Sequence, residues 1–318
     1  MALGSPAIDS IHVPVMLGEV IEALRVRDGG TYIDCTVGGG GHTSAILDAS
    51  GPAGRLLGLD MDPSAIDRTA LRLEEFRGCF LLANENFARL EEVAVTSGFY
   101  PVDGILFDLG VSSDLLWDPK RGFSFQHDAP LDMRFSDRQQ DTAADLVNHL
   151  SESDLADIIF RFGQERHSRR IARIIVANRP VLTTGQLAWL VERALGSSGR
   201  SSYKGRIHPA TRTFMALRIA VNKEMDSLAS ALPQAVKLLK PHGRLVVISF
   251  HSLEDGMVKG FFRRESSGCI CPPQIPQCVC GHSPSLRIVT KDPITPTEAE
   301  IRVNPRSRSA KMRVAEKL

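Results

Sequence analysis

The first third of the chain alternates short apolar runs with helical stretches, and this rhythm limits the folds that are open to it. The apolar runs predict four strands: 31–37, 55–62, 79–87 and 102–110. Between strands the pattern changes to that of helices, as over 42–50 and 63–76. Short strands that are apolar almost throughout are typical of a parallel sheet covered by helices on both faces. The chain is therefore predicted to be an α/β protein.

The strand signals stop after Val111 and return only in the C-terminal third. Helical periodicity fills the interval, and helices are expected at 154–162, 167–179 and 184–195. Pro209 can open a long helix that is expected to run through residue 228, and a further helical piece is expected to end at Lys240. Strands are then predicted at 243–250, 287–297 and 310–318.

Length and charge bear on the domains and on the partners. A chain of 318 residues exceeds the usual size of one domain. We predict a discontinuous sheet domain, residues 1–111 and 213–318, interrupted by a helical domain, residues 112–212. The net charge of +1 hides local differences, because 161–212 holds eleven basic and two acidic residues. A basic surface attracts phosphate-bearing partners, although many charged surfaces bind nothing.

A glycine-rich loop from Asp34 to His42 follows the first predicted strand and opens a helix. Glycine permits positive φ and close approach of a ligand to the main chain, and the amino end of a helix offers free amide donors. Asp60 ends the second strand and Asp108 the fourth. Since the carboxyl ends of parallel strands meet at one edge of a sheet, these residues predict a ligand site there.

The acidic rim of this site bears on which ligand it binds. A dinucleotide such as NAD places a pyrophosphate on the amino end of the helix, whereas S-adenosylmethionine has no phosphate and carries a cationic sulfur. Acids at the strand ends therefore favour S-adenosylmethionine. Two other classes of function stay open: an NAD-dependent oxidoreductase, and a non-catalytic RNA-binding protein with a vestigial cofactor fold.

Motifs spread in order over nearly the whole chain carry a family resemblance. They include DCTVGGGGHT, LLGLDMDPSAI, DGILFDLGVSS, HPATRTFMALRIAVN, RLVVISFHSLED and NPRSRSAKMRVAEK. Together they resemble the RsmH (MraW) family of bacterial small-subunit ribosomal RNA methyltransferases. The resemblance implies a Rossmann-like sheet of the class I S-adenosylmethionine-dependent methyltransferases with an inserted helical domain. It also implies methylation of the exocyclic N4 of one cytidine in the decoding region of 16S rRNA.

The resemblance further implies which residues contact the cofactor. They are Gly40, Gly41, His42, Asp60, Phe87 and Asp108. The ring of Phe87, after the third strand, is of the kind that can lie against adenine. Members of the family often have a polar residue a few positions after the DLGVSS motif, whereas this chain has Leu115, which puts a polar cofactor contact there in doubt.

A cytosine amine is a poor nucleophile because its lone pair is delocalised into the ring, so the site needs groups that orient it. The predicted catalytic residues are Asp108, Ser112 and His251, with Ser113 and Glu254 as further candidates and loop carbonyls after the fourth strand as hydrogen-bond acceptors. For His251 and Glu254, a hydrogen-bonded strand end is an equally good interpretation. The candidates for base stacking are Phe123, Phe125 and Phe250.

The implied partner is 16S rRNA, free or within the small ribosomal subunit. Two groups of basic residues in the insert are candidates for phosphate contacts: Arg166, Arg169, Arg170 and Arg173, and Lys204, Arg206, His208 and Arg212. No apolar run reaches the length of a membrane span, and the N-terminus lacks the layout of a signal peptide. A cytoplasmic protein without a membrane partner is expected. The oligomeric state stays open, a homodimer included.

Four of the six cysteines form a Cys-x-Cys-x6-Cys-x-Cys pattern in a loop rich in proline and glycine. They are Cys269, Cys271, Cys278 and Cys280, and His282 follows two residues later. Thiolates this close in a cytoplasmic protein suggest a small structural zinc site, with free thiols and a redox pair as alternatives. Cys35 and Cys79 stand alone in apolar runs and are predicted to be core residues.

Overall fold

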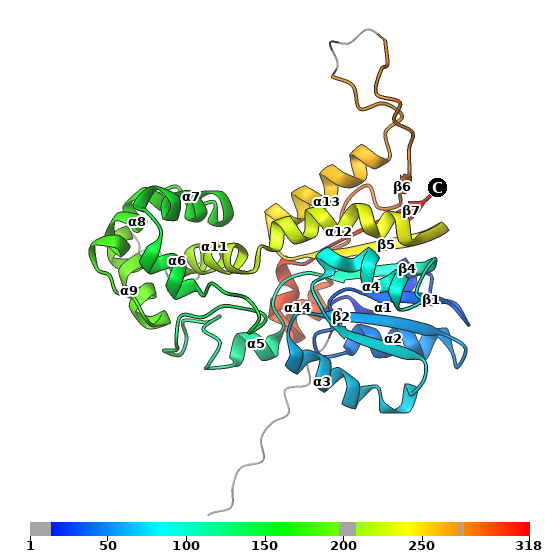
Figure 1. Cartoon of the computed structure of the whole chain (residues 1–318), viewed down its shortest axis with the longest axis horizontal. Coiled ribbons are helices and arrows are strands. Elements are labelled where there is room, and N and C mark those ends of the chain that lie inside the picture. Colours follow the sequence, from blue (N-terminus) through cyan, green and yellow to red (C-terminus); the bar gives the residue numbers. More distant parts are fainter. Residues whose placement is uncertain (1–13, 197–207, 273, 275–276) are drawn as a thin grey trace, which may run out of the picture.

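The structure is a computed structural model that describes residues 14–196, 208–272, 274 and 277–318. Its described residues form one seven-stranded sheet, with a helical unit to one side (Figure 1). The strands are β1 (Thr31–Asp34), β2 (Arg55–Asp60), β3 (Phe80–Asn84), β4 (Val102–Asp108), β5 (Leu239–Ser249), β6 (Leu286–Ile288) and β7 (Lys311–Lys317).

The strands lie in the order β3-β2-β1-β4-β5-β7-β6. The first five of these pair in parallel, as predicted for the N-terminal third. β7 is antiparallel to both of its neighbours, β5 and β6. This sheet confirms the predicted α/β class and the Rossmann-like fold of the class I methyltransferases.

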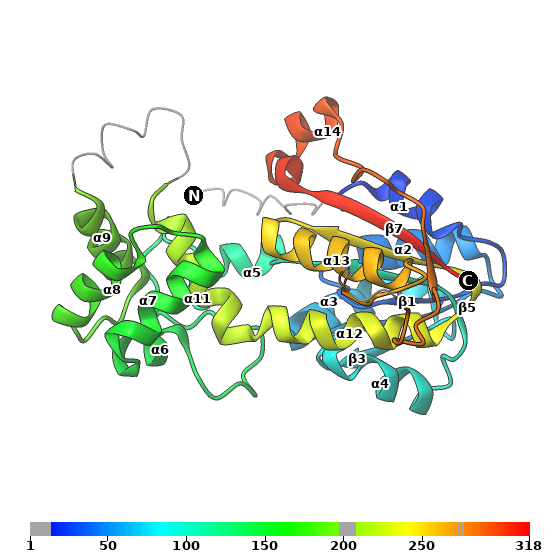
Figure 2. The ribbon, with the colours of Figure 1, turned by 90° about the horizontal axis from the view of Figure 1, so that it is seen from above.

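Side chains that alternate along the strands fill two apolar layers. On β4, Ile105 and Phe107 pack on one face of the sheet and Leu106 on the other. An apolar run without polar interruptions can supply both layers, which is why these strands are so hydrophobic. Figure 2 shows α1 and α4 on opposite sides of the sheet. The helices around it are α1 (Leu17–Leu24), α2 (Gly41–Ser50), α3 (Pro63–Arg72), α4 (Leu90–Thr96), α12 (Glu224–Leu238), α13 (Ser252–Glu265) and α14 (Glu298–Val303).

The helical unit has an apolar core of its own. Its helices are α5 (Ser113–Trp117), α6 (Ala143–His149), α7 (Glu152–Gly163), α8 (Ser168–Ala177), α9 (Thr184–Leu195) and α11 (Ala210–Asn222). The three helices predicted between 154 and 195 are confirmed as α7, α8 and α9. Helix α9 begins with a capping box, in which the Thr183 and Gln186 side chains each bind the other's backbone amide. None of the described helices is both long and apolar enough to span a membrane.

The single long helix expected from Pro209 through residue 228 is wrong, because α11 and α12 are separate. The chain turns between them at Lys223, whose φ of 50° lies in the left-handed region. Both guanidinium contacts from Arg218 to the Glu224 carboxylate measure 2.8 Å, so a bidentate ion pair spans the turn. Apolar periodicity continues through both helices and therefore gives no sign of the break.

The packing of α11 bears on where the helical domain ends. Phe214, Leu217 and Val221 belong to the apolar core of the helical unit, whereas Leu228 of α12 belongs to the core of the sheet. We therefore propose that the chain returns to the sheet domain at the Lys223 turn rather than at residue 213.

Two strand predictions also need correction. The strand expected over 287–297 is only Leu286–Ile288, followed by one isolated bridge at Ile294. Pro293 and Pro296 have no amide hydrogen, so a regular ladder cannot continue through them. The strand expected from residue 243 begins earlier, at Leu239, where an irregularity shifts its register against β4.

Because the sheet and the helical unit have separate cores, shortening a leucine in one core should destabilise that unit more than the other. Leu217→Ala should destabilise the helical unit by roughly 2–5 kcal/mol, because it empties a fully buried site. Hydrogen exchange should then speed up mainly in α7, α8 and α9. The matched variant Leu57→Ala, in the sheet core, should speed up exchange mainly in β1 and β4. The proposed boundary is wrong if Leu217→Ala instead weakens protection of the sheet alone.

Candidate active site

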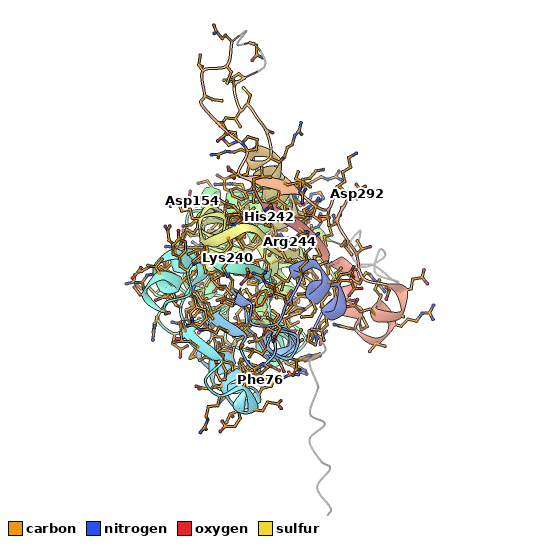
Figure 3. The ribbon with its side chains drawn as sticks, turned by 90° about the vertical axis from the view of Figure 1, so that its right-hand side faces the viewer. Phe76, Asp154, Lys240, His242, Arg244 and Asp292 are labelled. Atoms are coloured by element: carbon orange, nitrogen blue, oxygen red, sulfur yellow. The ribbon has the colours of Figure 1, made fainter. Side chains whose placement is uncertain are left out.

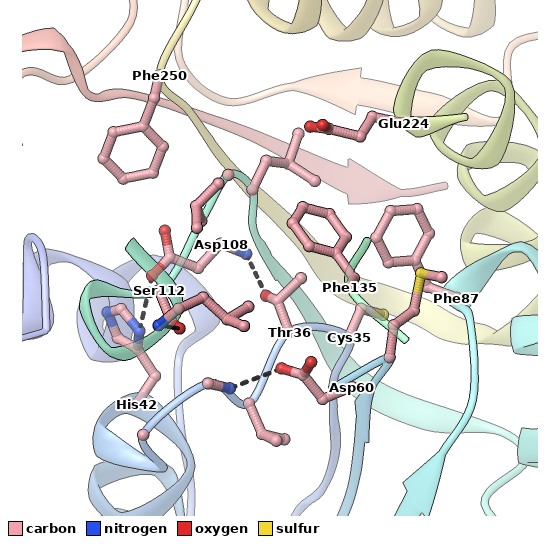
Figure 4. Close-up of a pocket in the computed structure, with 18 of the residues that line it drawn as sticks. Cys35, Thr36, His42, Asp60, Phe87, Asp108, Ser112, Phe135, Glu224 and Phe250 are labelled. Carbon is pink, nitrogen blue, oxygen red and sulfur yellow. Dashed lines mark hydrogen bonds and ion pairs between the residues drawn. The ribbon is translucent and has the colours of Figure 1, made fainter. Parts of the chain in front are cut away.

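A pocket lies at the carboxyl ends of the parallel strands, where the sheet meets the helical unit (Figure 4). Its walls come from the glycine loop, the strand ends, the segment leading into the helical unit and the C-terminal segment. The lining residues include Thr36, Gly38, Gly39, Gly41, His42, Asp60, Phe87, Asp108, Ser112, Leu115, Phe135, Asn222, Glu224, Phe250, Glu254, Asn304 and Arg306.

The glycine loop is held by hydrogen bonds to acids. Asp34 is fully buried beneath it and accepts from the Thr36 amide and from the Thr43 hydroxyl, at 3.1 and 2.7 Å. Gly41 is required at the start of α2, because a Cβ there would lie 2.2 Å from a carbon of Pro14. Gly40 has a φ of 75° but is not among the pocket-lining residues. Gly40 therefore allows the loop to turn and does not form part of the pocket wall.

Asp60 ties the loop to the end of β2. Its carboxylate accepts from the amides of Gly38 and Asp62, each at 2.9 Å. Burial raises the pKa of Asp60 to about 6, because it penalises the charged form more than these two amide bonds favour it. Each oxygen keeps a second lone pair, so the side chain can also accept from a ligand hydroxyl.

Asp108 lies at the centre of the pocket (Figure 4). Its amide donates to the Thr36 hydroxyl at 2.7 Å, which ties the ends of β1 and β4 together. One carboxylate oxygen, Oδ2, is 3.5 Å from His42 Nδ1, and the other ring nitrogen of His42 lies 2.9 Å from the Val15 carbonyl. The other carboxylate oxygen, Oδ1, is buried and has no hydrogen-bond partner among the described residues.

The environment of Asp108 raises its pKa to about 6. Burial is the main cause, and the nearby Asp34 and Glu254 carboxylates act in the same direction, while His42 opposes them. A buried acceptor without a donor is costly in a folded protein. Asp108 is therefore the group in this pocket that gains most from a hydrogen-bond donor supplied by a ligand.

Phe87 and Leu115 form apolar parts of the wall. The ring of Phe87 meets the buried Phe107 ring edge to face, with 5.5 Å between ring centroids, and is itself only partly buried. Phe87 can therefore offer its free surface to a flat ligand. Leu115 packs against the core of the helical unit and gives this side of the pocket no polar group.

Two of the predicted catalytic side chains are engaged in capping helices. The Ser112 hydroxyl accepts from the Leu115 amide at the start of α5, and Ser113 is the first residue of that helix. The His251 ring caps α13 and lies 3.1 Å from a Glu254 oxygen. His251 is not among the pocket-lining residues, whereas Glu254 is.

The three aromatic candidates for base stacking fall into different places. Phe250 lines the pocket and packs close to Gly110, where a Cβ would lie 3.3 Å from its ring. Phe123 and Phe125 pack instead in the core of the helical unit. The sequence analysis did not single out Phe135, which lines the pocket and stacks on Phe123 at 5.5 Å.

Further lining residues come from distant parts of the chain that the sequence analysis did not assign to the site. Asn222, at the end of α11, donates to the Met133 carbonyl and accepts from the Phe135 amide, each at 2.8 Å, and so fixes the loop that carries Phe135. Asn304 and Arg306 reach the pocket from the segment before β7. The NPRSRS run that contains them was a motif of the family resemblance, which is the signal that could have found them.

The basic residues of the insert differ in how they are paired. Arg166, Arg169 and Arg170 are exposed, and no ion pair joins them to a described residue. Arg173 lies 3.5 Å from the carboxylate of Glu152, and Arg212 lies at the same distance from that of Glu165. The ring of His208 is bound to Glu192 and stacks on Phe125. Lys204 and Arg206 lie outside the described residues.

The four clustered cysteines lie away from this pocket. They belong to the segment 266–285, which joins α13 to β6 and which we call the arm (Figure 1). Cys35 is buried under the pocket and Cys79 is partly buried, and both are free thiols.

A family model and two related sequences agree on the family of this chain. Residues 9–318 match the model of the MraW methylase family. A protein of Dehalococcoides mccartyi named ribosomal RNA small subunit methyltransferase H is 57% identical over 98% of this chain and 88% of its own length. One of the same name from Thermomicrobium roseum is 52% identical over 100% of this chain and 97% of its own. A solved rRNA methylase from Streptococcus thermophilus is 11% identical, with a TM-score of 0.41, over 95% of this chain and 93% of that one.

The raised pKa of Asp108 predicts that its replacement by neutral asparagine stabilises the folded protein, and that the effect depends on pH. The ordinary pKa of an aspartate is 3.8, and that of Asp108 in the folded protein is about 6. At pH values between these two, Asp108 binds a proton in the folded state but has lost it in the unfolded state, so stability falls as the pH rises. Asp108→Asn should therefore stabilise the ligand-free protein by roughly 1–3 kcal/mol at pH 8 and by almost nothing at pH 4, as measured by urea unfolding.

Asp103→Asn is the matched control, because its carboxylate has the opposite environment. Lys240 and the Thr31 amide bind it at 2.8 and 2.9 Å, and together with Arg27 they hold its pKa below the ordinary value in spite of burial. This variant should lose stability at pH 8, and the loss should shrink as the pH falls towards the ordinary pKa of an aspartate. A loss of stability at pH 8 in Asp108→Asn as well would contradict our account of Asp108.

Proposed function

The chain belongs to the MraW methylase family, and we propose that it transfers the methyl group of S-adenosylmethionine to the exocyclic N4 of a cytidine in 16S rRNA. The observation that carries the proposal is the buried, unpartnered Oδ1 of Asp108 beside the glycine loop. A cytosine amine is a donor that could satisfy this oxygen. The names of the relatives, which specify the small ribosomal subunit, support the choice of RNA.

The lining of the pocket fits S-adenosylmethionine better than a dinucleotide. The Gly38 amide, one of the loop donors that a phosphate would need, already donates to Asp60. Asp60 and Asp108 make the rim acidic, which suits a cationic sulfonium and ribose hydroxyls. Phe87 offers an aromatic surface for adenine. We found no observation that favours an NAD-dependent oxidoreductase or a vestigial cofactor fold.

When bound, S-adenosylmethionine would supply an electrophilic methyl group: the nitrogen–carbon bond forms as the sulfur–carbon bond breaks, S-adenosylhomocysteine leaves, and one amine proton is lost to solvent. The residues of this chain act by holding the amine in position and by excluding water. A hydrogen bond accepted by Asp108 Oδ1 would hold one amine hydrogen and concentrate the lone pair on nitrogen. The contact of Oδ2 with His42 keeps the carboxylate in place. Phe250 and Phe135, which both line the pocket, are the rings that could hold the base.

Several finer parts of the prediction belong to this proposal. The exposed Arg166, Arg169 and Arg170 are proposed contacts for rRNA phosphates, free or in the small subunit. We propose a cytoplasmic location, because ribosomal RNA is the proposed substrate. Methyl transfer needs no metal, so a zinc ion at the four cysteines of the arm would be structural.

Separate measurements of cofactor affinity and turnover test the proposed roles. Asp108→Ala should reduce methyl incorporation into rRNA by about 100-fold or more, since it removes the acceptor that orients the amine. Asp60→Ala should mainly weaken binding of S-adenosylmethionine, measured by calorimetry. Asp67→Ala, which removes an exposed acid from α3, should leave both quantities unchanged. Unchanged methyl incorporation in folded Asp108→Ala would sink the assignment.

The role of the basic insert can be tested through salt dependence. Reversal of charge in Arg169→Glu with Arg170→Glu should raise the KM for rRNA and reduce the slope of log affinity against log salt by about 1–2. Arg77→Glu is the control, because Arg77 is exposed just before β3, at the edge of the sheet away from the pocket. If the double variant keeps the salt slope of the wild type, the insert does not bind the RNA backbone through α8.

A further inference from the structure

The arm has almost no apolar interior to hold its shape. Figure 3 shows its described part rising clear of the sheet and helices. Most of its described residues are exposed, including Ile270 and Val279 at 41% and 75%. A short segment without a core needs another source of order, such as a disulfide or a metal ion.

The four cysteines of the arm converge on one point although they come from two separate pairs. Each Sγ lies within 4.8 Å of the other three. The separations are 3.5 Å for Cys269 and Cys278, 3.6 Å for Cys278 and Cys280, and 3.9 Å for Cys269 and Cys280. Four sulfurs about 2.3 Å from a tetrahedral zinc ion would be about 3.8 Å apart. Sulfurs in a disulfide would be about 2.0 Å apart, and all four cysteines are free thiols.

Backbone amides point at these sulfurs in a reciprocal pattern. Ile270, between the first two cysteines, donates to Cys280 at 3.5 Å. Val279, between the second two, donates to Cys271 at 3.4 Å. Amide donors stabilise thiolates, which are the form of cysteine that binds a metal.

The neighbouring histidine does not belong to the ligand set. His282 Nε2 lies 3.1 Å from the Arg264 carbonyl, so it ties the base of the arm to the end of α13. The other group of ligand-type side chains, Glu224, His251 and Glu254, already has a cation, because Arg218 pairs with Glu224. Of these groups, only the four cysteines offer a full set of thiolates, which are the ligands that a soft metal ion prefers.

We propose that Cys269, Cys271, Cys278 and Cys280 bind one Zn²⁺ as a tetrahedral tetrathiolate, and that this ion holds the arm in shape. Binding takes the sulfurs as thiolates, so their protons pass to solvent as the ion enters. The ion is structural and separate from methyl transfer, and the inference does not rest on the proposed function.

Metal analysis of the full-length chain tests this site directly. The protein is purified without a metal-affinity tag, with reductant, and reconstituted with Zn²⁺ before removal of excess ion. Wild type and Cys79→Ser, which changes a cysteine outside the arm, should each hold about one zinc per chain. Cys271→Ser with Cys280→Ser should hold almost none, while it still binds S-adenosylmethionine as wild type does.

A second measurement keeps the test decisive if the double variant folds poorly. Wild type stripped by a chelator under reducing conditions should lose protection of the arm against proteases, and added Zn²⁺ should restore it at one equivalent. Cobalt in place of zinc should show the strong visible absorption of a tetrahedral thiolate site. Reconstituted wild type without zinc, or equal zinc in the double variant, would overturn the proposal.

Discussion

The parallel pairing of β1 with β2 and β4 is the constraint on which the site depends. It brings the glycine loop, Asp60 and Asp108 to one edge of the sheet, and short hydrogen bonds then fix their positions. The Gly38 amide binds Asp60, and the Asp108 amide binds the Thr36 hydroxyl. Because these contacts join strand ends to one another, the pocket is already formed by the fold. The helical unit closes one side of it with Leu115 and Phe135.

The same arrangement places charge where the folded protein does not favour it. Asp60 and Asp108 both have raised pKa values because they are removed from water, and Oδ1 of Asp108 lacks a donor. Structures usually avoid buried acceptors of this kind. Here the loss of folding stability is expected to disappear when a ligand supplies hydrogen-bond donors and positive charge. The carboxylates that lower the stability of the folded protein are therefore the ones that we propose position the substrate.

Much of this could be predicted from the sequence, since the strands that form the site are apolar throughout and end in acids. What could not be predicted depends on packing. The turn at Lys223 interrupts a continuous helical period, so the sequence pattern does not show that α11 packs in the core of the helical unit. Phe123 and Phe135 have the same residue type, yet the ring of Phe123 is buried in the helical unit, and only Phe135 lines the pocket. His251 and Glu254 form a capping box at the start of α13, which agrees with the structural one of the two interpretations that the sequence left open for them.

The identity of the methylated atom tests the proposal most directly. Small ribosomal subunits from cells that lack this methyltransferase can be incubated with the protein and S-adenosylmethionine that carries a deuterated methyl group. After digestion of the 16S rRNA to nucleosides, mass spectrometry separates cytidines methylated on N4 from those methylated on C5 or on the ribose. We predict deuterium in N4-methylcytidine, confined to one fragment of the decoding region. Deuterium in another nucleoside, or none in the rRNA, would contradict the account.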